Sequence, residues 1–413
     1  MTKTFENSRR VVITGMGIWS CLGTTLDEVK QSLYEGRSGI ILDASRKELG
    51  FQSALTAAVP HPELKGVIDR AHRVFMGEPA QYAYMATDAS LKMAGMDREY
   101  LERHDVGLLY GNDSTADAVV ASVDRMRDKK NTMLCGSGAI FQSMNSTVTM
   151  NLGCLFKLKG INMTVSAACA SGSHAIGLGA ALIHWGLQDC VVCGGAQEVN
   201  AFSIGSFDGI GAFSKRESEP EKASRPFDAN RDGLVPSGGA ASLVLESYES
   251  AVARGATILG EVLGYGFSSN GDHISSPNVE GPKKSLLMAI EQSGIRKEDI
   301  GYVNAHATST PVGDANEAKA IFEVFGEGMP PVTSTKGQTG HEMWMAGASE
   351  VIYSMLMMKN QFIAPNLNFE RGDEATSRLN IQATRLDNYA FDTFLSNSFG
   401  FGGTNSTLII RNL

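Results

Sequence analysis

The sequence has few of the features that would place the protein in a membrane, in an oxidising compartment or on nucleic acid. No stretch reaches the roughly 18 uninterrupted apolar residues of a membrane span, and the first ten residues lack the apolar core of a signal peptide. The six cysteines show no disulfide-framework spacing. Acidic residues outnumber basic ones, 45 to 36, and the net charge of -9 argues against general binding to nucleic acid or to a membrane surface. These absences predict a protein of the reducing cytoplasm.

Cys190 and Cys193 form a C-x-x-C pattern, but the sequence does not favour a metal site there. The two cysteines lie in an apolar run that is typical of a buried strand. Strand residues three positions apart point to opposite faces, and no second pair of ligands is spaced for zinc. We therefore expect both cysteines in the core and predict no metal.

The chain of 413 residues exceeds what one hydrophobic core usually serves, and it contains signs of an internal repeat. Three segments of the first half resemble three segments of the second half in the same order, which indicates a duplicated α/β unit more than chance similarity. The pairs are the glycine turns at Gly15 and Gly264, the segments starting at Gly107 and Gly301, and the spacing of Ser166, Gly172 and Gly179, which Ser334, Gly340 and Gly347 repeat.

Strand-like runs alternate with helix-like segments along both halves, which predicts mixed, mostly parallel sheets with helices on both faces. The predicted strands are 10–14, 106–110, 161–165, 190–193, 261–263, 302–305, 332–335 and 393–396. Thr25 and Glu28 predict a capped helix that ends near Gly36. We place the halves at 1–253 and 254–413, and interpret the charged segment 215–231 as a long surface loop.

Cys169 lies where a predicted strand gives way to a long run of small, helix-like residues. A cysteine at such a turn meets the positive end of the helix dipole, which favours the nucleophilic thiolate. A lone buried cysteine is commonly structural, so the position alone leaves covalent catalysis and packing about equally open.

Three further polar residues follow predicted strands of the second half. His306 follows the strand 302–305, and Lys336 and His341 follow the strand 332–335. Sheets of this kind present ligands at the carboxyl ends of their strands. Two histidines and a lysine on such turns, together with Cys169, therefore predict one catalytic site. The other histidines are interpreted as structural.

Four motifs resemble those of the elongating β-ketoacyl-[acyl-carrier-protein] synthases, and the resemblance extends from Gly15 to the C-terminus. The motifs are Ser-Ala-Ala-Cys169-Ala-Ser-Gly, Asn-Ala-His306-Ala-Thr-Ser-Thr-Pro-Val-Gly-Asp314, Ser-Thr-Lys336-Gly-Gln-Thr-Gly-His341 and Asn-Ser-Phe399-Gly-Phe401-Gly-Gly-Thr-Asn. The resemblance implies a thiolase-like duplicated α/β fold, in which mixed sheets of two related halves sandwich buried helices. It also implies a homodimer, with a heterodimer of related subunits left open.

The resemblance assigns chemistry to these residues. An acyl chain would pass from its carrier protein to Cys169, with backbone N–H groups of Cys169 and Phe401, beside Gly402, as the oxyanion hole. His306 and His341 would stabilise the enolate formed when a malonyl thioester loses CO2. Lys336 would order and polarise the site through its charge. No cofactor is implied, because both substrates arrive on the phosphopantetheine of acyl carrier protein.

Supporting roles have structural alternatives. Glu317 matches a family acid near Lys336, but the spacing Asp314 to Glu317 also resembles a capping box. Glu350 could face Lys336 or solvent. Thr308 and Thr310 match family residues that bind phosphopantetheine. The alternative is that their hydroxyls only make hydrogen bonds with nearby backbone groups. Phe399 and Phe401 could both be core aromatics. For Phe401, which lies beside three glycines, the alternative is a mobile gate.

Docking of an acidic carrier protein requires a basic patch, and the sequence offers two. One consists of Lys65, Arg70 and Arg73, and the other of Arg125, Arg127, Lys129 and Lys130. Such charge runs are more commonly solvated helix faces.

Several positions depart from the family pattern. Ala307 replaces a glycine, Trp344 and Met345 replace small residues near His341, and Trp19 replaces a small aliphatic residue. Segment 112–115 is unusually polar. The leading prediction is a condensing enzyme of fatty-acid elongation. The alternatives are a ketosynthase of a specialised polyketide or aryl-polyene-type pathway and, disfavoured by Cys169 and the two histidines, a non-catalytic chain-length partner.

Overall fold

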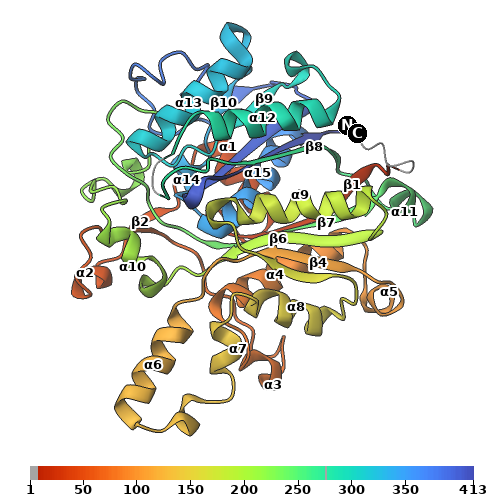
Figure 1. Cartoon of the computed structure of the whole chain (residues 1–413), viewed down its shortest axis with the longest axis vertical. Helices are drawn as coiled ribbons and strands as arrows, with labels where there is room; N and C mark the ends of the chain where they lie inside the picture. The colour runs from red at the N-terminus through yellow and green to blue at the C-terminus, as the bar shows by residue number, and fades with distance from the viewer. Residues whose placement is uncertain (1–7, 275–276) are drawn as a thin grey trace.

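Ten strands form one mixed sheet in the computed structural model, which describes residues 8–274 and 277–413 (Figure 1). The sheet order is β10-β9-β13-β14-β8-β1-β7-β6-β4-β5. β1 and β8 pair over only two positions, so the sheet divides there into two halves of five strands. The first-half strands are β1 (Val11–Trp19), β4 (Gly107–Gly111), β5 (Asn162–Val165), β6 (Cys190–Gln197) and β7 (Gly239–Ser247), and the second-half strands are β8 (Gly260–Ser269), β9 (Tyr302–Asn304), β10 (Val332–Thr333), β13 (Thr393–Gly400) and β14 (Thr404–Arg411).

The two halves repeat the same strand order and the same strand directions. In the first, β4 is parallel to β5 and β6, whereas β7 is antiparallel to β6 and β1. In the second, β9 is parallel to β10 and β13, whereas β14 is antiparallel to β13 and β8. The thiolase-like duplicated α/β fold is thereby confirmed.

All eight strands predicted from the sequence are present, but the expectation of mostly parallel sheets is wrong. The two long strands that the sequence analysis missed, β7 and β14, make all four antiparallel pairs named above. β14 follows β13 after a short turn at Phe401–Gly403. Only antiparallel strands can be joined by so short a connection.

The helices and the two halves of the sheet form five layers (Figure 1). α4 (Glu78–Met93) and α8 (Thr147–Phe156) cover the outside of one half, and α12 (Glu280–Ser293) and α13 (Pro311–Phe325) cover the outside of the other. α9 (Ser171–His184) and α15 (Ala346–Lys359) lie between the two. Every residue of α15 except Lys359 is buried, as a helix in a middle layer requires.

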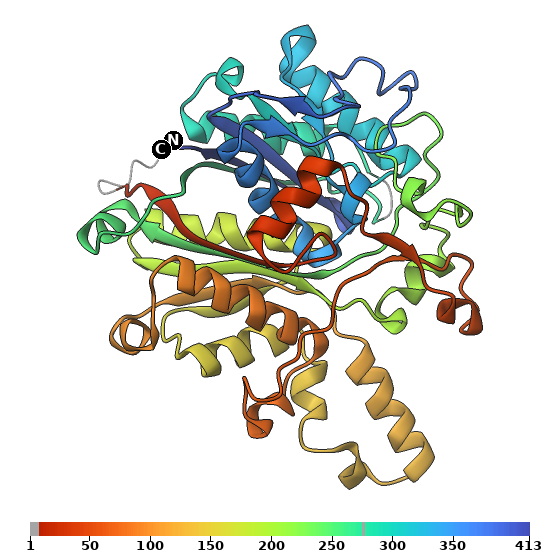
Figure 2. The ribbon, with the colours of Figure 1, turned by 180° about the vertical axis from the view of Figure 1, so that it is seen from behind.

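Smaller elements complete the fold. Figure 2 shows α1 (Leu26–Glu35) beside α15; α1 has the predicted capping box of Thr25 and Glu28 and ends at Gly36, which has φ 66°. The others are α2 (Ser45–Glu48), α3 (Arg70–Arg73), α5 (Arg98–Arg103), α6 (Asp117–Lys129), α7 (Ala139–Ser143), α10 (Ala201–Gly209), α11 (Tyr248–Ala253), α14 (Lys336–Thr339), and the strand pairs β2 (Ile40–Leu42) with β3 (Leu55–Ala57) and β11 (Phe362–Ile363) with β12 (Leu386–Asp387). Among the residues described, no helix combines the length and apolar character needed to cross a membrane.

Glycines permit equivalent outer helices to approach the sheet closely. A Cβ on Gly17 of β1 would collide with the carbonyl oxygen of Ala86 in α4, and a Cβ on Gly266 of β8 would collide with that of Ser285 in α12. The glycine turns that the sequence analysis paired therefore have the same packing function in both halves.

One part of the predicted repeat has the wrong register. The turns that precede α9 and α15 correspond, since Ala168 and Met343 both have positive φ, 45° and 48°. Gly172 therefore corresponds to Gly347 and not to Gly340. The difference arises because the second half has an added segment after β10, which comprises α14 with Gly340 and His341.

Cys190 and Cys193 are buried in β6, in two different core clusters, as predicted for side chains on opposite faces of a strand. In the part of the chain that the structure describes, no group of three or more His, Cys, Asp or Glu residues is arranged to hold a metal ion.

Candidate active site

Cys169 lies in the short 3₁₀ turn Ala168–Ala170 that joins β5 to α9. Ala168 adopts a left-handed backbone conformation, which costs free energy for a residue with a side chain. Several hydrogen bonds hold the turn; among them, Ala168 N–H donates to Asp113 Oδ2 over 3.1 Å, and Ser171 Oγ donates to the carbonyl oxygen of Ala168 over 2.6 Å. The turn keeps the Cys169 side chain, only 3% exposed, at the base of a cavity.

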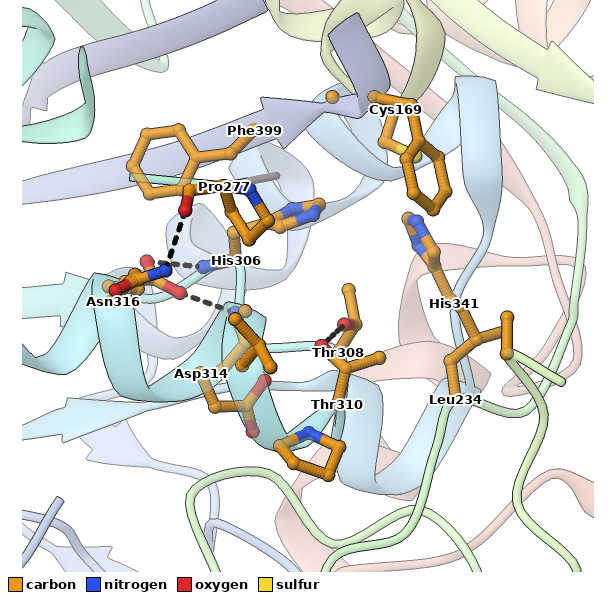
Figure 3. Close-up of a pocket in the computed structure, with 18 of the residues that line it drawn as sticks. Cys169, Leu234, Pro277, His306, Thr308, Thr310, Asp314, Asn316, His341 and Phe399 are labelled. Atoms are coloured by element: carbon orange, nitrogen blue, oxygen red, sulfur yellow. Dashed lines mark hydrogen bonds between the residues drawn. The ribbon is translucent and has the colours of Figure 1, made fainter. Parts of the chain in front are cut away.

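This cavity of about 470 Å³ brings together residues that lie far apart in the sequence (Figure 3). Cys169, His306 and His341 all line it, and so do Phe399 and Phe401. The rings of His306 and His341 meet edge to face, with their centroids 5.3 Å apart. The Nδ1 atoms of both rings are buried and make no hydrogen bond within the described residues. The predicted nucleophile and both predicted imidazoles therefore share one chamber.

Glu317 of α13 positions the segment that carries His306. Its carboxylate accepts hydrogen bonds from the backbone N–H of His306 at 2.8 Å and of Ala307 at 2.7 Å, and Asn397 donates a third at 3.1 Å. The capping-box alternative is wrong, because α13 begins at Pro311 and Glu317 lies inside it. Burial raises the pKa of Glu317 to about 7.

Lys336 and Glu350 form a buried ion pair behind the cavity. Lys336 lies on α14 and Glu350 on α15, and each side chain is 1% exposed. Glu350 therefore faces inward, and the solvent alternative is wrong. Lys336 does not line the cavity, but its charge lowers the pKa of Cys169, His306 and His341.

Burial controls the proton affinities of the three catalytic candidates. It raises the pKa of the Cys169 thiol to about 12, although the Lys336 charge and the backbone N–H groups of Cys169 and Phe401 oppose this rise. The backbone N–H groups at this turn favour the thiolate, as expected for a helix N-terminus, but burial outweighs them and the resting group is the thiol. Burial, followed by the Lys336 charge, lowers the pKa of both His306 and His341 well below the ordinary value. Both imidazoles are neutral at neutral pH.

Two backbone N–H groups lie at the sulfur. Those of Cys169 and Phe401 hydrogen-bond to the thiol and lower its pKa. Phe401 begins the turn between β13 and β14, in which Gly402 has φ 79°, a left-handed conformation that favours glycine. The Phe401 ring is 44% exposed and stacks on Phe207, with 5.8 Å between centroids. Phe399 instead lies against His306, at 5.8 Å.

The outer part of the cavity is lined by the loop that follows His306. Thr308 and Thr310 both line it and share a hydrogen bond of 3.1 Å (Figure 3). The rim carries the exposed apolar side chains of Ile210 and Val312. The cavity thus runs from an apolar rim, past two hydroxyls, to the thiol.

The seven basic residues predicted for docking do not line this cavity. Arg70 and Arg73 lie on α3, while Arg125, Arg127 and Lys129 lie on α6. Both helices extend beyond the layer of α4 and α8 (Figures 1 and 2). Within one chain, the structure does not bring Lys65, Lys130 or the other five to the cavity mouth.

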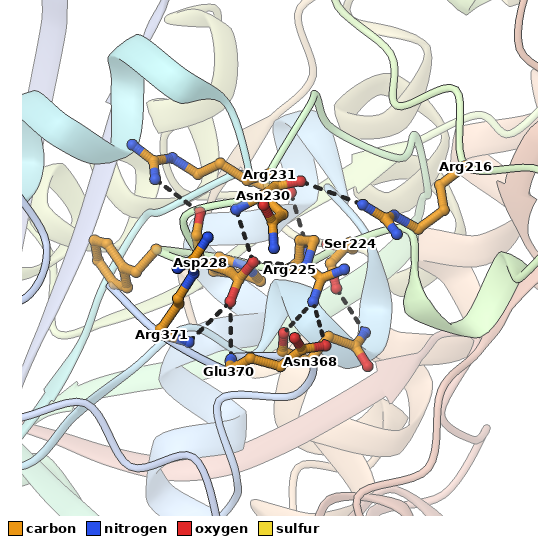
Figure 4. Close-up of polar contacts among 12 residues, drawn as sticks. Arg216, Ser224, Arg225, Asp228, Asn230, Arg231, Asn368, Glu370 and Arg371 are labelled. Carbon is orange, nitrogen blue, oxygen red and sulfur yellow. Dashed lines mark hydrogen bonds and ion pairs between the residues drawn. The ribbon is translucent and has the colours of Figure 1, made fainter. Parts of the chain in front are cut away.

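The segment 215–231 is not a simple surface loop, because two of its arginines are buried (Figure 4). Arg231 donates to the carbonyl oxygen of Thr310 at 3.2 Å and forms an ion pair with Asp373 at 2.7 Å. Arg225 pairs with Asp228 at 3.0 Å, and Asp228 accepts the backbone N–H of Glu370 at 2.8 Å. The segment therefore fixes the cavity wall at Thr310 to the loop around 370.

Sequence reasoning did not single out Glu342, which is buried next to His341. Tyr353 donates a hydrogen bond of 2.7 Å to its carboxylate, and Ser349 donates another. Burial raises the pKa of Glu342 to about 7, and the charge of Lys336 opposes this rise. An acidic residue directly before the apolar residues 343–348 was the sequence signal that could have identified it.

Glu342→Gln is expected to make stability less dependent on pH. The folded protein holds the Glu342 proton up to about pH 7, whereas the unfolded chain releases it near 4.5. Its stabilising contribution is therefore complete below 4.5 and is lost as the pH rises through 7. Glutamine cannot ionise, so the variant should gain about 3 kcal/mol relative to wild type across this window.

Urea unfolding at about pH 5 and about pH 8 measures this difference. Glu291→Gln, at an exposed position of α12, is the matched control and should follow wild type. An equal pH dependence in Glu342→Gln and wild type would contradict the assigned ionisation.

Comparison with known proteins gives a consistent result. The family model for the β-ketoacyl synthase N-terminal domain matches residues 8–251, and that for the C-terminal domain matches residues 259–370. The 3-oxoacyl-[acyl-carrier-protein] synthase 1 of Haemophilus influenzae is 40% identical over 405 residues, which cover 98% of this chain and 99% of that protein. The enzyme of the same name from Escherichia coli K12 is 41% identical over 408 residues, with the same coverage.

Solved structures are similar over the same extent. A β-ketoacyl synthase from Burkholderia phymatum superposes with a TM-score of 0.93 at 35% identity, covering 98% of this chain and all of that one. The ishigamide ketosynthase/chain length factor superposes with a TM-score of 0.90 at 29% identity. A type II PKS ketosynthase in complex with its acyl-carrier protein superposes with a TM-score of 0.89 at 27% identity. In both of these ketosynthase structures, the match covers 98% of this chain and all of the other chain.

Proposed function

The chain belongs to the β-ketoacyl synthase family, and from this premise we propose how its cavity carries out the condensation. The enzyme is a β-ketoacyl-[acyl-carrier-protein] synthase, an acyltransferase that extends acyl chains in fatty-acid elongation. The observation that carries the proposal is the single chamber in which Cys169, His306 and His341 meet two backbone N–H groups.

In the first half-reaction, the Cys169 sulfur attacks the carbonyl carbon of the acyl thioester. The thiol proton ends on the departing sulfur of the carrier arm, as the new C–S bond forms and the old one breaks. The backbone N–H groups of Cys169 and Phe401 stabilise the negative oxygen of the tetrahedral intermediate. The Lys336 charge and the same N–H groups lower the pKa of the sulfur and so favour its attack.

In the second half-reaction, a malonyl thioester replaces the first carrier arm. Its bond to the carboxylate breaks, CO2 leaves, and the electron pair becomes an enolate. Neutral His306 and His341 donate hydrogen bonds to the enolate oxygen. The enolate carbon attacks the acyl carbonyl on Cys169, the C–S bond breaks, and the sulfur takes up one proton. No bound cofactor takes part in this proposal, because the departing carboxylate supplies the electron pair.

Acyl carrier protein is the partner that delivers both substrates. The exposed apolar rim at Ile210 and Val312 supports docking at this opening, and the position of Thr308 and Thr310 in the cavity lining supports their proposed contact with the phosphopantetheine arm. We propose the cytoplasm as the compartment, since all six cysteines are free.

The proposed assembly is a homodimer. β5 is an edge strand of the sheet, and Met163 on it is 54% exposed. Ile140 and Phe141 of α7, and Met133 in the turn before it, add exposed apolar side chains in the same region of the fold. An unpaired edge strand beside an apolar face is a surface that a second copy can cover. A related chain in place of the second copy is the alternative.

A specialised polyketide ketosynthase is the second candidate. The similarity to the ishigamide and type II PKS ketosynthases favours it, although both are less identical to this chain than the synthase 1 enzymes are.

The test is reconstitution with an acyl carrier protein and a malonyl carrier protein. We expect an acyl adduct on the protein, release of CO2, and a β-ketoacyl carrier two carbons longer than the acyl donor, all followed by mass spectrometry. Absence of both adduct and product across a panel of short, long, saturated and conjugated acyl carriers would overturn the proposal.

A further inference from the structure

Trp344 occupies in the second half the position that Cys169 occupies in the first. It is the central residue of the 3₁₀ turn Met343–Met345 before α15, as Cys169 is of the turn before α9. The central helices meet at these ends: a Cβ on Gly172 would lie 3.0 Å from the backbone nitrogen of Ala348, and a Cβ on Gly347 would lie 2.5 Å from that of Ser173. The nucleophile and the tryptophan therefore lie side by side at the centre of the molecule.

The Trp344 side chain is packed into the apolar cluster next to the thiol. This cluster of buried residues consists of Cys169, Ile204, Phe213, Leu234, Met343 and Trp344, and the indole residue is only 6% exposed. Trp344 does not line the cavity that leads from the rim to Cys169. It therefore occupies space beside the sulfur that is separate from the entry path.

The far edge of the indole is fixed by a hydrogen bond. Trp344 Nε1 donates to Ser114 Oγ over 3.3 Å. The next residue, Thr115, lines a second cavity of about 410 Å³ together with Glu78, Glu198 and other polar residues. The indole thus lies between the nucleophile and the segment that forms a wall of this second, polar cavity.

The reaction requires two separate spaces at Cys169. The cavity from the rim must be free for the malonyl arm while the acyl chain remains on the sulfur, so the acyl chain needs room elsewhere. The apolar cluster beside the thiol offers the right chemistry, but Trp344 fills it, and polar groups lie beyond. An added methylene in a closed apolar site changes the preference by about 10–200-fold.

We propose that Trp344 sets the acyl-chain specificity by closing the acyl-binding space behind Cys169, so that the enzyme accepts short acyl chains and excludes long saturated ones. This inference rests on the proposed function, since it concerns the chain that is loaded on Cys169. Trp344 is a specificity-determining residue and has no part in bond making.

The test compares hexanoyl and hexadecanoyl carrier proteins as donors, with the rate of Cys169 acylation measured by intact mass. Wild type should load hexanoyl at least about tenfold faster than hexadecanoyl. Trp344→Gly should reduce this preference at least about tenfold, because it frees the volume of the indole. Trp344→Phe is the matched control and should keep most of the preference, since a ring still fills the site.

Removal of a buried indole leaves a cavity that destabilises the fold, so Trp344→Leu is included, with thermal unfolding measured for each variant. Trp344→Leu should show a preference for hexanoyl that lies between those of wild type and Trp344→Gly. Wild type that loads both donors equally, or folded Trp344→Gly and Trp344→Leu variants that keep the wild-type preference, would overturn the inference and leave the proposed function standing. If Trp344→Gly does not fold, the same comparison of hexanoyl with hexadecanoyl loading in Trp344→Leu tests the inference. Failure of wild type to load either donor, or any other acyl carrier, would instead overturn the proposed function.

Discussion

Cys169→Ala is expected to reduce condensation by at least about 10³-fold, because the covalent intermediate can no longer form. Cys169 is the one cysteine, among the residues that the structure describes, that lines the central cavity. Intact-mass measurement after incubation with hexanoyl carrier protein should show no acyl adduct. Cys154→Ala, at an exposed position of α8, is the matched control and should load like wild type.

Cys169→Gln extends this prediction to the second half-reaction. His306, His341 and Lys336 remain in this variant, and the amide side chain resembles an acylated cysteine in polarity and size. We expect it to retain malonyl decarboxylation without condensation. An adduct of normal yield on Cys169→Ala would show that another residue is the nucleophile.

His341→Ala is expected to separate the two half-reactions. Acylation of Cys169 should persist, because the oxyanion hole consists of backbone N–H groups that the change does not touch. Decarboxylation should fall by about 10²–10³-fold, the usual cost of losing one oxyanion donor. The backbone at this position is held by hydrogen bonds with Val235 and Ser237, so the fold should survive.

The measurement pairs adduct formation by intact mass with release of labelled CO2 from malonyl carrier protein. His104→Ala, at an exposed position, is the control and should leave both rates unchanged. Equal loss of both half-reactions in His341→Ala would contradict its assignment to the enolate step.

The sequence predicted the positions of the reacting groups well because local signals mark them. Cys169 and His306 each follow a short strand after one to three small residues, His341 follows β10 after the short helix α14, and the structure brings all three to one cavity. The missed strands β7 and β14 lack such signals: β7 follows a long connection and pairs with distant strands, and β14 follows a glycine-rich turn and pairs with its neighbour β13 and with the distant β8.

Interactions between distant segments account for the other errors. The capping interpretation of Glu317 relied on spacing alone, whereas its actual partners, the N–H groups of His306 and Ala307, belong to another element. The sequence around Glu350 does not indicate whether its side chain points inward or outward, because α15 is buried on every side and has no polar face. Arg225 also contacts Glu370 and the carbonyl oxygen of Asn368, which lie outside 215–231, so the charge pattern of that segment does not reveal its burial.

The mutual contact of α9 and α15 has a consequence for the origin of the molecule. Each helix covers the inner face of its own half of the sheet and shields the other helix, so one half alone would expose an apolar helix to water. An ancestor of half this length would have been stable only as a symmetrical pair, with two identical turns at the centre. In the present chain, one of the two central turns carries the reactive sulfur and the other carries an indole.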